Sequence, residues 1–322
     1  MQRRTFSSLV LTVGGLAASG AAWSQAGPTA PLRLVVPYAA GGPTDSIARM
    51  IATKMSASLG QPIVVDNRAG AGGTIGVDAT AKATPDGYTL ALVAPGPLAG
   101  MPNLMKVPYT LDDLQFLTLA ARISSVIVVS RKSGITSLAQ LIDKAKAEPD
   151  ALNYSSAGAG TTPHIGFELF KRETGTRIMH VPYKGAAPAI SAVLSGEVQM
   201  TMVDLLPVLP HAASGSLVVL AVAGKARAPQ LPDVPTTMEL GYSNVLMETT
   251  YGLIAPKGLP APVQAKLRNA AVAAIEAPEM KAQFLKQGAI AATSTGAEYQ
   301  RLIQAESDKW RGVIASAKIT LD

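Results

Sequence analysis

The sequence predicts an α/β protein with two lobes, in which parallel sheets are covered by helices on both faces. From Pro31 onward, short β-branched runs alternate with segments of helical period, a pattern typical of parallel sheets. The chain has 322 residues, and single cores stop growing at roughly 250 to 300 residues, so two lobes are expected. With 48% hydrophobic residues, 16% charged residues and no cysteine, the composition excludes intrinsic disorder and a disulfide scaffold.

The first 26 residues are expected to be an export signal. Arg3 and Arg4 precede an apolar stretch at 9–23, and Ala26 ends a short run with small residues at which cleavage is expected. The arginine pair fits a twin-arginine signal, but Sec export stays equally open. A membrane anchor is the alternative, although several glycines interrupt the apolar stretch. The expected location is the periplasm.

The charge balance gives no indication of a nucleic-acid partner. Without Arg3 and Arg4, the mature chain carries 26 basic and 22 acidic residues, a net charge of +4. Aromatic residues make up only 5% of the chain, and no block of five basic residues occurs. Surfaces that stack bases or follow a polyanion are therefore not expected.

The first strand and helix follow directly from the apolar pattern. The run 32–36 predicts a buried strand, and apolar residues from Ile47 to Leu59 then recur at spacings of three and four. The helix is expected to begin at Pro43 and to stop at Gly60. The same criteria predict further strands at 63–65, 88–93, 125–129, 152–155, 178–181, 198–203, 217–222 and 251–254, and further helices at 138–146, 163–173, 187–194, 262–275, 279–286 and 297–316.

The turn after the first strand is the first candidate binding segment, because open sheets bind ligands at the carboxyl ends of their strands. Its diglycine allows close approach to the backbone, and free amides at the start of the following helix attract anions. The alternative is that Thr44 or Asp45 only caps the helix. The candidate ligand-binding residues here are Tyr38, Ala40, Gly41, Gly42, Thr44 and Asp45.

A second turn, at 154–164, repeats this chemistry with hydroxyls and glycines before another helix. A lone histidine in a first helical turn is more often a structural hydrogen-bonding residue than a metal ligand or a base, and the structural role is favoured for His164. The candidate ligand-binding residues of this turn are Ser155, Ser156, Gly158, Gly160, Thr161 and His164.

A third turn and one strand end complete the candidate site. Tyr183 either covers a ligand or packs at the rim of one lobe, and Lys184 is interpreted as a rim charge. Gly185 and Ala186 then lead into a helix. Asp204, at the end of a strand, either receives a ligand ammonium or hydroxyl group or caps the next turn.

Enzyme signatures are weak in this chain. The segment 70–76 has isoleucine where the dinucleotide fingerprint needs glycine, and no phosphate loop, zinc motif or nucleophile elbow occurs. The histidines are His164, His180 and His211. No catalytic residue, metal site or cofactor is therefore predicted, and an exported enzyme that acts on a carboxylic acid is the least favoured alternative.

Six segments together resemble a Bug-type periplasmic solute receptor of the tripartite tricarboxylate transporter family. They are VPYAAGGPTD at 36–45, VVDNRAGAGG at 64–73, PDGYTL at 85–90, SSAGAGTTPH at 155–164, VPYKGAAPA at 181–189 and LPDVPT at 231–236. The resemblance implies a two-lobe periplasmic-binding-protein (Venus-flytrap, type II) fold with two crossovers between the lobes. It also implies a small carboxylate in the interlobe cleft, held largely by amides and hydroxyls of the first two turns.

The lobes and partners follow from this resemblance. Lobe 1 is expected at 27–124 and 250–322 and lobe 2 at 125–249, with crossings near 121–125 and 249–253. The expected partners are a small organic acid and membrane permease subunits, and the receptor is expected to be a monomer. The alternative is a ligand sensor for a membrane signalling partner.

Two positions depart from the family pattern. The segment 94–99 offers no side-chain donor where such receptors carry hydroxyls or amides, which favours a mono- or dicarboxylate over a tricarboxylate. Tyr251 stands where a tryptophan is common, so this position of the cleft wall is expected to differ.

Overall fold

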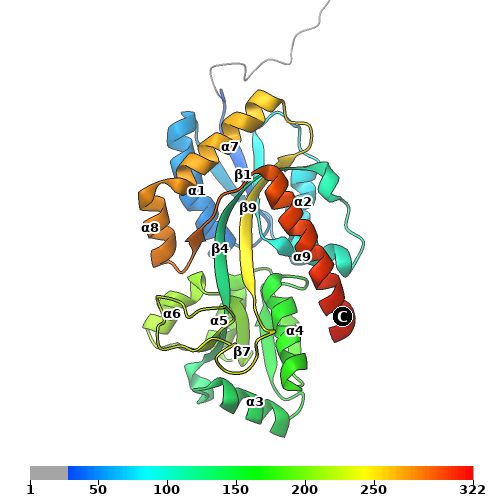
Figure 1. The fold of residues 1–322 in the computed structure, drawn as a ribbon, viewed down its shortest axis with the longest axis vertical. Helices are drawn as coiled ribbons and strands as arrows, with labels where there is room; N and C mark the ends of the chain where they lie inside the picture. The colour runs from blue at the N-terminus through cyan, green and yellow to red at the C-terminus, as the bar shows by residue number, and fades with distance from the viewer. Residues whose placement is uncertain (1–27, 322) are drawn as a thin grey trace, which may run out of the picture.

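The computed structural model describes residues 28–321, and the expected export signal and its cleavage site lie outside this range. Figure 1 shows two halves arranged along the long axis of the molecule, with two long strands, β4 (Leu114–Ser130) and β9 (Glu248–Pro256), running between them. The arrangement is the two-lobe periplasmic-binding-protein fold. Within the described range, no helix is long and apolar enough to cross a membrane.

The upper half is built on a parallel sheet. β1 (Leu32–Val36) lies between β2 (Ile63–Asn67) and β3 (Thr89–Val93), with Leu34 opposite both Val65 and Leu90. The helices of this half are α1 (Pro43–Leu59), α2 (Thr74–Ala81), α7 (Ala261–Glu276), α8 (Pro278–Lys286) and α9 (Gly296–Ala317). α1 buries the apolar face that the sequence predicts, including Ile47 and Met55.

The lower half repeats this plan. β5 (Asn153–Ser156) lies between β6 (Met179–Pro182) and β7 (Met200–Asp204), and both pairings are parallel. β8 (Leu217–Val222) pairs with β4. The helices of this half are α3 (Leu138–Ala147), α4 (Thr162–Thr174), α5 (Ala186–Ser195) and α6 (Leu209–Ala213). In its core, the rings of Tyr154 and Phe167 stack with centroids 3.9 Å apart.

β4 and β9 connect the two halves and depart from the parallel pattern that the sequence predicts. They pair antiparallel with each other as far as Ser124 opposite Glu248. From Ser125 onward, β4 pairs antiparallel with β7 and β8. The predicted strand at 125–129 is therefore only the end of β4. Most residues of β4 are buried, so its sequence lacks the alternation that marks a half-exposed strand.

The remaining predicted elements agree with the structure to within a few residues. Two α-helices and one strand of the described residues were not predicted: α2, α6 and the short strand β10 (Ile290–Ala291). β4 changes strand partners between Ser124 and Ser125, near the expected crossing. The lobe boundaries themselves stay a prediction. One hydrophobic cluster contains side chains of both halves, among them Tyr38, Ala186 and Val203.

Candidate ligand-binding site

A cavity lies between the two halves, beside the crossing strands. The empty space in and around it, including open solvent at its mouth, is about 430 Å³. Small-molecule pockets are usually concave and mostly apolar with a few polar groups, and this lining has that character. The lining residues are Tyr38, Gly42, Pro43, Thr44, Ala94, Ala157, Thr161, Thr162, Pro163, Ala186, Val203, Asp204, Thr249 and Tyr251.

Three helices begin at this cavity without a side-chain cap. The N-cap residues are Gly42 for α1, Thr161 for α4 and Gly185 for α5. The two glycines have no side chain that could cap the helix, and the Thr161 side chain accepts no hydrogen bond from the first helical turn. First-turn amides have no partner within their own helix, and the helix dipole places partial positive charge at this end. The cavity therefore has the chemistry of an anion site even though its lining contains no lysine, arginine or histidine.

Asp204 is the only carboxylate in this lining, and hydroxyl groups already surround it. Its Oδ1 accepts hydrogen bonds from Thr249 Oγ1 at 2.6 Å and from Ser125 Oγ at 3.2 Å. Its Oδ2 accepts one from the Tyr251 hydroxyl. Burial raises the pKa of Asp204, and these three hydrogen bonds act in the opposite direction. Its main role in this geometry is to hold Thr249 and Tyr251 in place along the cavity wall.

Two tyrosines form aromatic walls of the cavity. Burial and the nearby Asp204 raise the pKa of both Tyr38 and Tyr251, so both phenols are neutral donors at physiological pH. The Tyr38 hydroxyl lies 3.4 Å from the carbonyl oxygen of Gly72, which it can donate to. Tyr251, predicted as a changed cleft wall, does line the cavity and donates to Asp204.

Six of the predicted ligand-binding residues line this cavity: Tyr38, Gly42, Thr44, Thr161, Ala186 and Asp204. The predicted residues that do not line it are Ala40, Gly41, Asp45, Ser155, Ser156, Gly158, Gly160, His164, Tyr183 and Gly185. These ten residues flank the cavity or hold its turns.

Asp45 is occupied by a structural network. Its Oδ2 accepts hydrogen bonds from the Gly41 amide and from Arg49 Nε, both at 3.0 Å, and its Oδ1 accepts one from Asn67 Nδ2 at 3.1 Å. These hydrogen bonds lower the pKa of Asp45 even though burial acts to raise it. Asp45 thus stabilises the turn before α1. Ala40 and Gly41 lie exposed at the tip of this turn.

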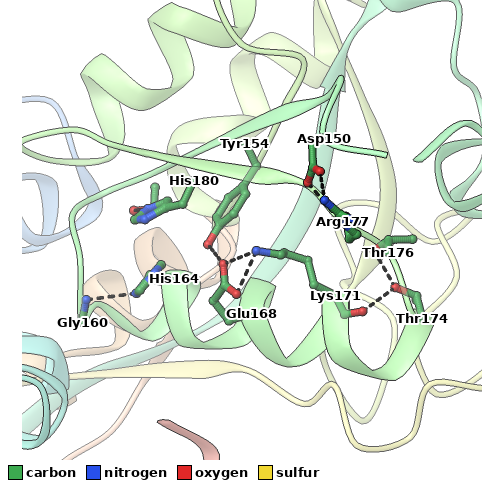
Figure 2. Close-up of polar contacts among 11 residues, drawn as sticks. Asp150, Tyr154, Gly160, His164, Glu168, Lys171, Thr174, Thr176, Arg177 and His180 are labelled. Atoms are coloured by element: carbon green, nitrogen blue, oxygen red, sulfur yellow. Dashed lines mark hydrogen bonds and ion pairs between the residues drawn. The ribbon is translucent and has the colours of Figure 1, made fainter. Parts of the chain in front are cut away.

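The second turn is also held by internal hydrogen bonds. His164 Nδ1 accepts from the Gly160 amide at 3.1 Å, as Figure 2 shows. Ser156 Oγ accepts from the Gly158 amide and lies 2.7 Å from His180 Nε2, and Ser155 Oγ donates to the carbonyl oxygen of Ala189. The structural role that the sequence favours for His164 therefore agrees with its geometry.

The two histidines of this region are stacked and buried. The ring centroids of His164 and His180 are 4.1 Å apart. Burial lowers the pKa of His164 to about 4, with a smaller contribution from the Lys171 charge. Burial, together with His164, lowers the pKa of His180 to about 3. Both rings are therefore neutral near pH 7.

The third turn supplies contacts at the rim. The Tyr183 hydroxyl donates to Glu197 at 2.6 Å, and burial together with Glu197 raises the pKa of Tyr183 to about 12. This geometry matches the alternative that Tyr183 packs at the rim. Gly185 has φ +148°, and its backbone lies close to Ala39 of the other half.

The two halves touch across the mouth of the cavity. The Ala39 amide donates to the carbonyl oxygen of Lys184 at 3.0 Å, which links the first turn to the third. A Cβ added to Gly100 would lie 2.0 Å from the carbonyl oxygen of Gly160, so only glycine fits at this approach. The structure is therefore a closed arrangement.

Sequence reasoning missed several lining residues. Ala157, Thr162 and Pro163 lie inside the second turn and could have been found there. Ala94 follows β3, and its position agrees with the predicted lack of a donor. Thr249 lies on a crossing strand, where no turn motif indicates a site.

The described residues hold no cluster of histidine, cysteine or acidic side chains that could bind a metal ion. The only polar side chains of the cavity lining are hydroxyls and the Asp204 carboxyl group. This set of groups can hold a small anion through hydrogen bonds.

Comparison with known proteins assigns the family. Residues 47–319 match the family described as tripartite tricarboxylate transporter family receptor. Protein BugT of Bordetella pertussis is 37% identical over 290 residues, which cover 89% of each chain.

Solved structures agree with this result. An R. palustris protein solved with adipate is 33% identical and superposes with a TM-score of 0.88, over 91% of this chain and 99% of that one. The periplasmic binding protein BugD is 31% identical with a TM-score of 0.87, over 91% and 99% of the two chains. A Rhodopseudomonas palustris protein with bound malate is 29% identical with a TM-score of 0.84, over 89% and 99%.

Proposed function

The chain belongs to the family of tripartite tricarboxylate transporter receptors, which are periplasmic solute-binding proteins, and from that premise we propose that it captures a small organic carboxylate between its halves and delivers it to membrane permease subunits. The observation that carries the proposal is the meeting of three helix starts without side-chain caps at one cavity that lacks basic side chains. A carboxylate supplies the negative charge and the acceptors that these amides need.

Hydrogen bonds of this kind contribute free energy on the scale that micromolar binding requires. A hydrogen bond to a charged group contributes roughly 1.5 to 3 kcal/mol. Three or four of them contribute roughly 4.5 to 12 kcal/mol before association costs are subtracted, a range that includes the roughly 8 kcal/mol that corresponds to a micromolar Kd. No arginine or lysine is needed to hold the ligand.

We propose that the carboxylate is bound by the backbone at Gly42, Thr44, Thr162 and Ala186, at the starts of the three helices. Tyr38 and Tyr251 then enclose the rest of the ligand. The other predicted turn residues act by holding these groups in position, as Asp45 and His164 do.

The distal end of the ligand faces a weakly polar wall. Ala94, Ala157 and Val203 line the cavity, and none has a polar side chain. Relatives of the family have been solved with adipate and with malate, both dicarboxylates. A mono- or dicarboxylate with an apolar middle fits this wall better than a tricarboxylate, whose extra charges would lack partners.

We further propose that the protein is exported to the periplasm, acts as a monomer and has no catalytic activity. Asp204, the carboxylate of the cavity, already accepts hydrogen bonds from three hydroxyls, and the cavity lining contains no histidine, lysine or cysteine to pair with it. Mass analysis of the periplasmic protein tests cleavage after Ala26, and light scattering tests the monomer. A retained Met1 would contradict export by cleavage.

Native mass spectrometry of the mature protein, purified without added ligand, tests the central proposal. The expected result is a co-purified organic acid, and calorimetry with a series of mono-, di- and tricarboxylates should then rank tricarboxylates last. Turnover of the bound acid, or tighter binding of an uncharged amide analogue than of the acid, would contradict the proposal.

A further inference from the structure

A second cavity lies on the opposite face of β9. Alternate residues of a strand point to opposite faces, and this strand divides its side chains between two cavities. Thr249 and Tyr251 line the first cavity, whereas Glu248 and Thr250 line the second. The empty space of the second, including open solvent at its edge, is about 570 Å³. Its lining residues are Arg122, Thr162, Leu246, Met247, Glu248, Thr250, Leu302, Glu306, Lys309 and Trp310.

Three polar atoms that line this second cavity have no hydrogen-bond partner among the described residues. They are Thr162 Oγ1, Thr250 Oγ1 and Glu306 Oε2, and each atom is buried. Thr162 and Thr250 are both only 3% exposed. A buried polar group without a partner costs roughly 1 to 3 kcal/mol, so native proteins rarely keep several of them around one space. Their convergence indicates a polar occupant.

The charges around the second cavity favour an anion. Arg122 lies 3.5 Å from Glu248, and both side chains are partly exposed at the edge. Lys309 forms no ion pair within residues 28–321, since no salt bridge there includes it. The lining therefore has two cations, Arg122 and Lys309, and two carboxyl groups, Glu248 and Glu306. With Glu306 neutral, the cations outnumber the carboxylates.

Glu306 is mostly neutral at pH 7. Burial raises its pKa to about 8, and Glu248 adds to the rise, whereas Lys309 and Arg122 oppose it. The other titratable group coupled to it is the phenol of Tyr299, whose pKa burial and Glu306 raise. A protonated Glu306 carboxyl group is a hydrogen-bond donor to an anion.

We propose that this second cavity is a binding site for a small monocarboxylate the size of acetate, held by the hydroxyls of Thr162 and Thr250, the Glu306 carboxyl group and Lys309. The site is separate from the proposed transport site, because β9 lies between the two. Its walls come from α4 of the lower half and α9 of the upper half, so an occupant contacts both halves.

A consequence, which rests on the proposed function, is coupling between the two sites. Thr162 lines both cavities, and it stands at the start of the α4 helix that faces the transport ligand. An occupant that joins α4 to α9 favours the closed arrangement, so it should tighten transport-ligand binding, and the reverse must hold to the same degree.

Titration with ¹³C-acetate, followed by NMR, tests the second site directly. The wild type should bind two acetates. Gly42→Val, which fills the first cavity, should keep the second-site acetate, whereas Thr250→Val should weaken that acetate by roughly tenfold and keep the first. Thr250→Val replaces an unpaired hydroxyl with a methyl group, so an unchanged or higher melting temperature shows that the fold is intact.

The pH dependence supplies an independent readout. In the Gly42→Val background, acetate affinity should fall by up to tenfold per pH unit above pH 8, as Glu306 ionises, and adding Glu306→Gln should remove this dependence. If Gly42→Val abolishes all acetate binding, or Thr250→Val changes none of it, the second cavity holds water only and the inference is wrong. If instead only Thr250→Val abolishes binding, the inference stands and the proposed transport site fails.

Discussion

Buried polar side chains of this protein mostly hold other groups in place. Asp204 accepts hydrogen bonds from three hydroxyls, and Asp45 joins the Gly41 amide, Arg49 and Asn67. Each carboxylate therefore sets the position of several groups around it. The cost of burying such a charge is offset only while these partners remain.

Asp204→Asn should destabilise the protein by about 1 to 3 kcal/mol. The NH₂ group of the asparagine is a donor, and it would face hydroxyl groups that donate to the carboxylate in the wild type. Ser125→Ala is the matched control, since it removes only the longest of the three hydrogen bonds, at 3.2 Å, and should cost less than about 1.5 kcal/mol. Urea denaturation at pH 7 measures both. Equal losses in the two variants would show that the carboxylate does not organise this wall.

The buried histidines predict a loss of stability in mild acid. His164 has a folded pKa of about 4 and an ordinary value of 6.5, so the unfolded chain binds more protons as pH falls between these values. The free energy of unfolding should therefore drop as pH falls from 6.5 to 4, by about 3 kcal/mol for this residue.

His164→Asn keeps an acceptor near the Gly160 amide and removes the titrating group. Its free energy of unfolding should fall less than that of the wild type between pH 6.5 and 4, with the two compared by denaturation at each pH. A wild-type curve that is flat over this window would contradict the buried neutral state of the ring.

The helix starts at the cavity lack side-chain caps, as do those of α2, α6, α7 and α8 elsewhere. α3 and α9 have side-chain caps, from Ser137 and from a Thr295–Glu298 capping box, whereas α1, α4 and α5 have none at the cavity. A side-chain cap would occupy the amides that a ligand needs. Because no side chain caps α1, α4 and α5, their first-turn amides stay open to a ligand in the cavity.

Gly42→Val should weaken carboxylate binding at least tenfold. The backbone of Gly42 is extended, with φ −82° and ψ 174°, and its Cβ would meet no atom closer than 3.7 Å, so valine fits the fold while its methyl groups enter the cavity. The exposed Lys184 is the control, and Lys184→Ala should change the affinity by less than about threefold. Calorimetry that shows the lysine change to be the more damaging would overturn binding by helix amides.

Local patterns account for what the sequence could predict at the scale of elements. The bounds of α1 and β8 were predicted correctly, because spacing, capping glycines and β-branched runs are local signals. The antiparallel crossing was not predicted, because the pairing of β4 with β9 joins segments more than a hundred residues apart. Thr249 enters the site through that pairing, which no local motif encodes.

Hydrogen bonds at several places hold the two halves together. At the cavity mouth the Ala39 amide donates to Lys184, and elsewhere Arg172 of α4 donates to Ser316 Oγ of α9 at 2.5 Å. Gln230 also donates to the carbonyl oxygen of Leu285. Apart from the hydrophobic cluster that the halves share, these contacts are single hydrogen bonds, whereas β4 and β9 form a continuous connection. An opening that breaks the former and bends the latter is the motion this architecture favours.

Ligand binding should therefore make the protein more compact and raise its melting temperature. Without ligand, the hydrogen bonds across the mouth are little stronger than those that the same groups form with water, so the halves should separate. With ligand, the three helix starts must converge, as in this closed structure. At a hundredfold excess over Kd the stabilisation should be about 2.7 kcal/mol. Small-angle scattering should give a smaller radius of gyration for the liganded protein and no change for Gly42→Val under the same conditions. A higher melting temperature without any change in the wild-type radius of gyration would show that the receptor is rigid, and permease subunits could not then recognise occupancy by shape.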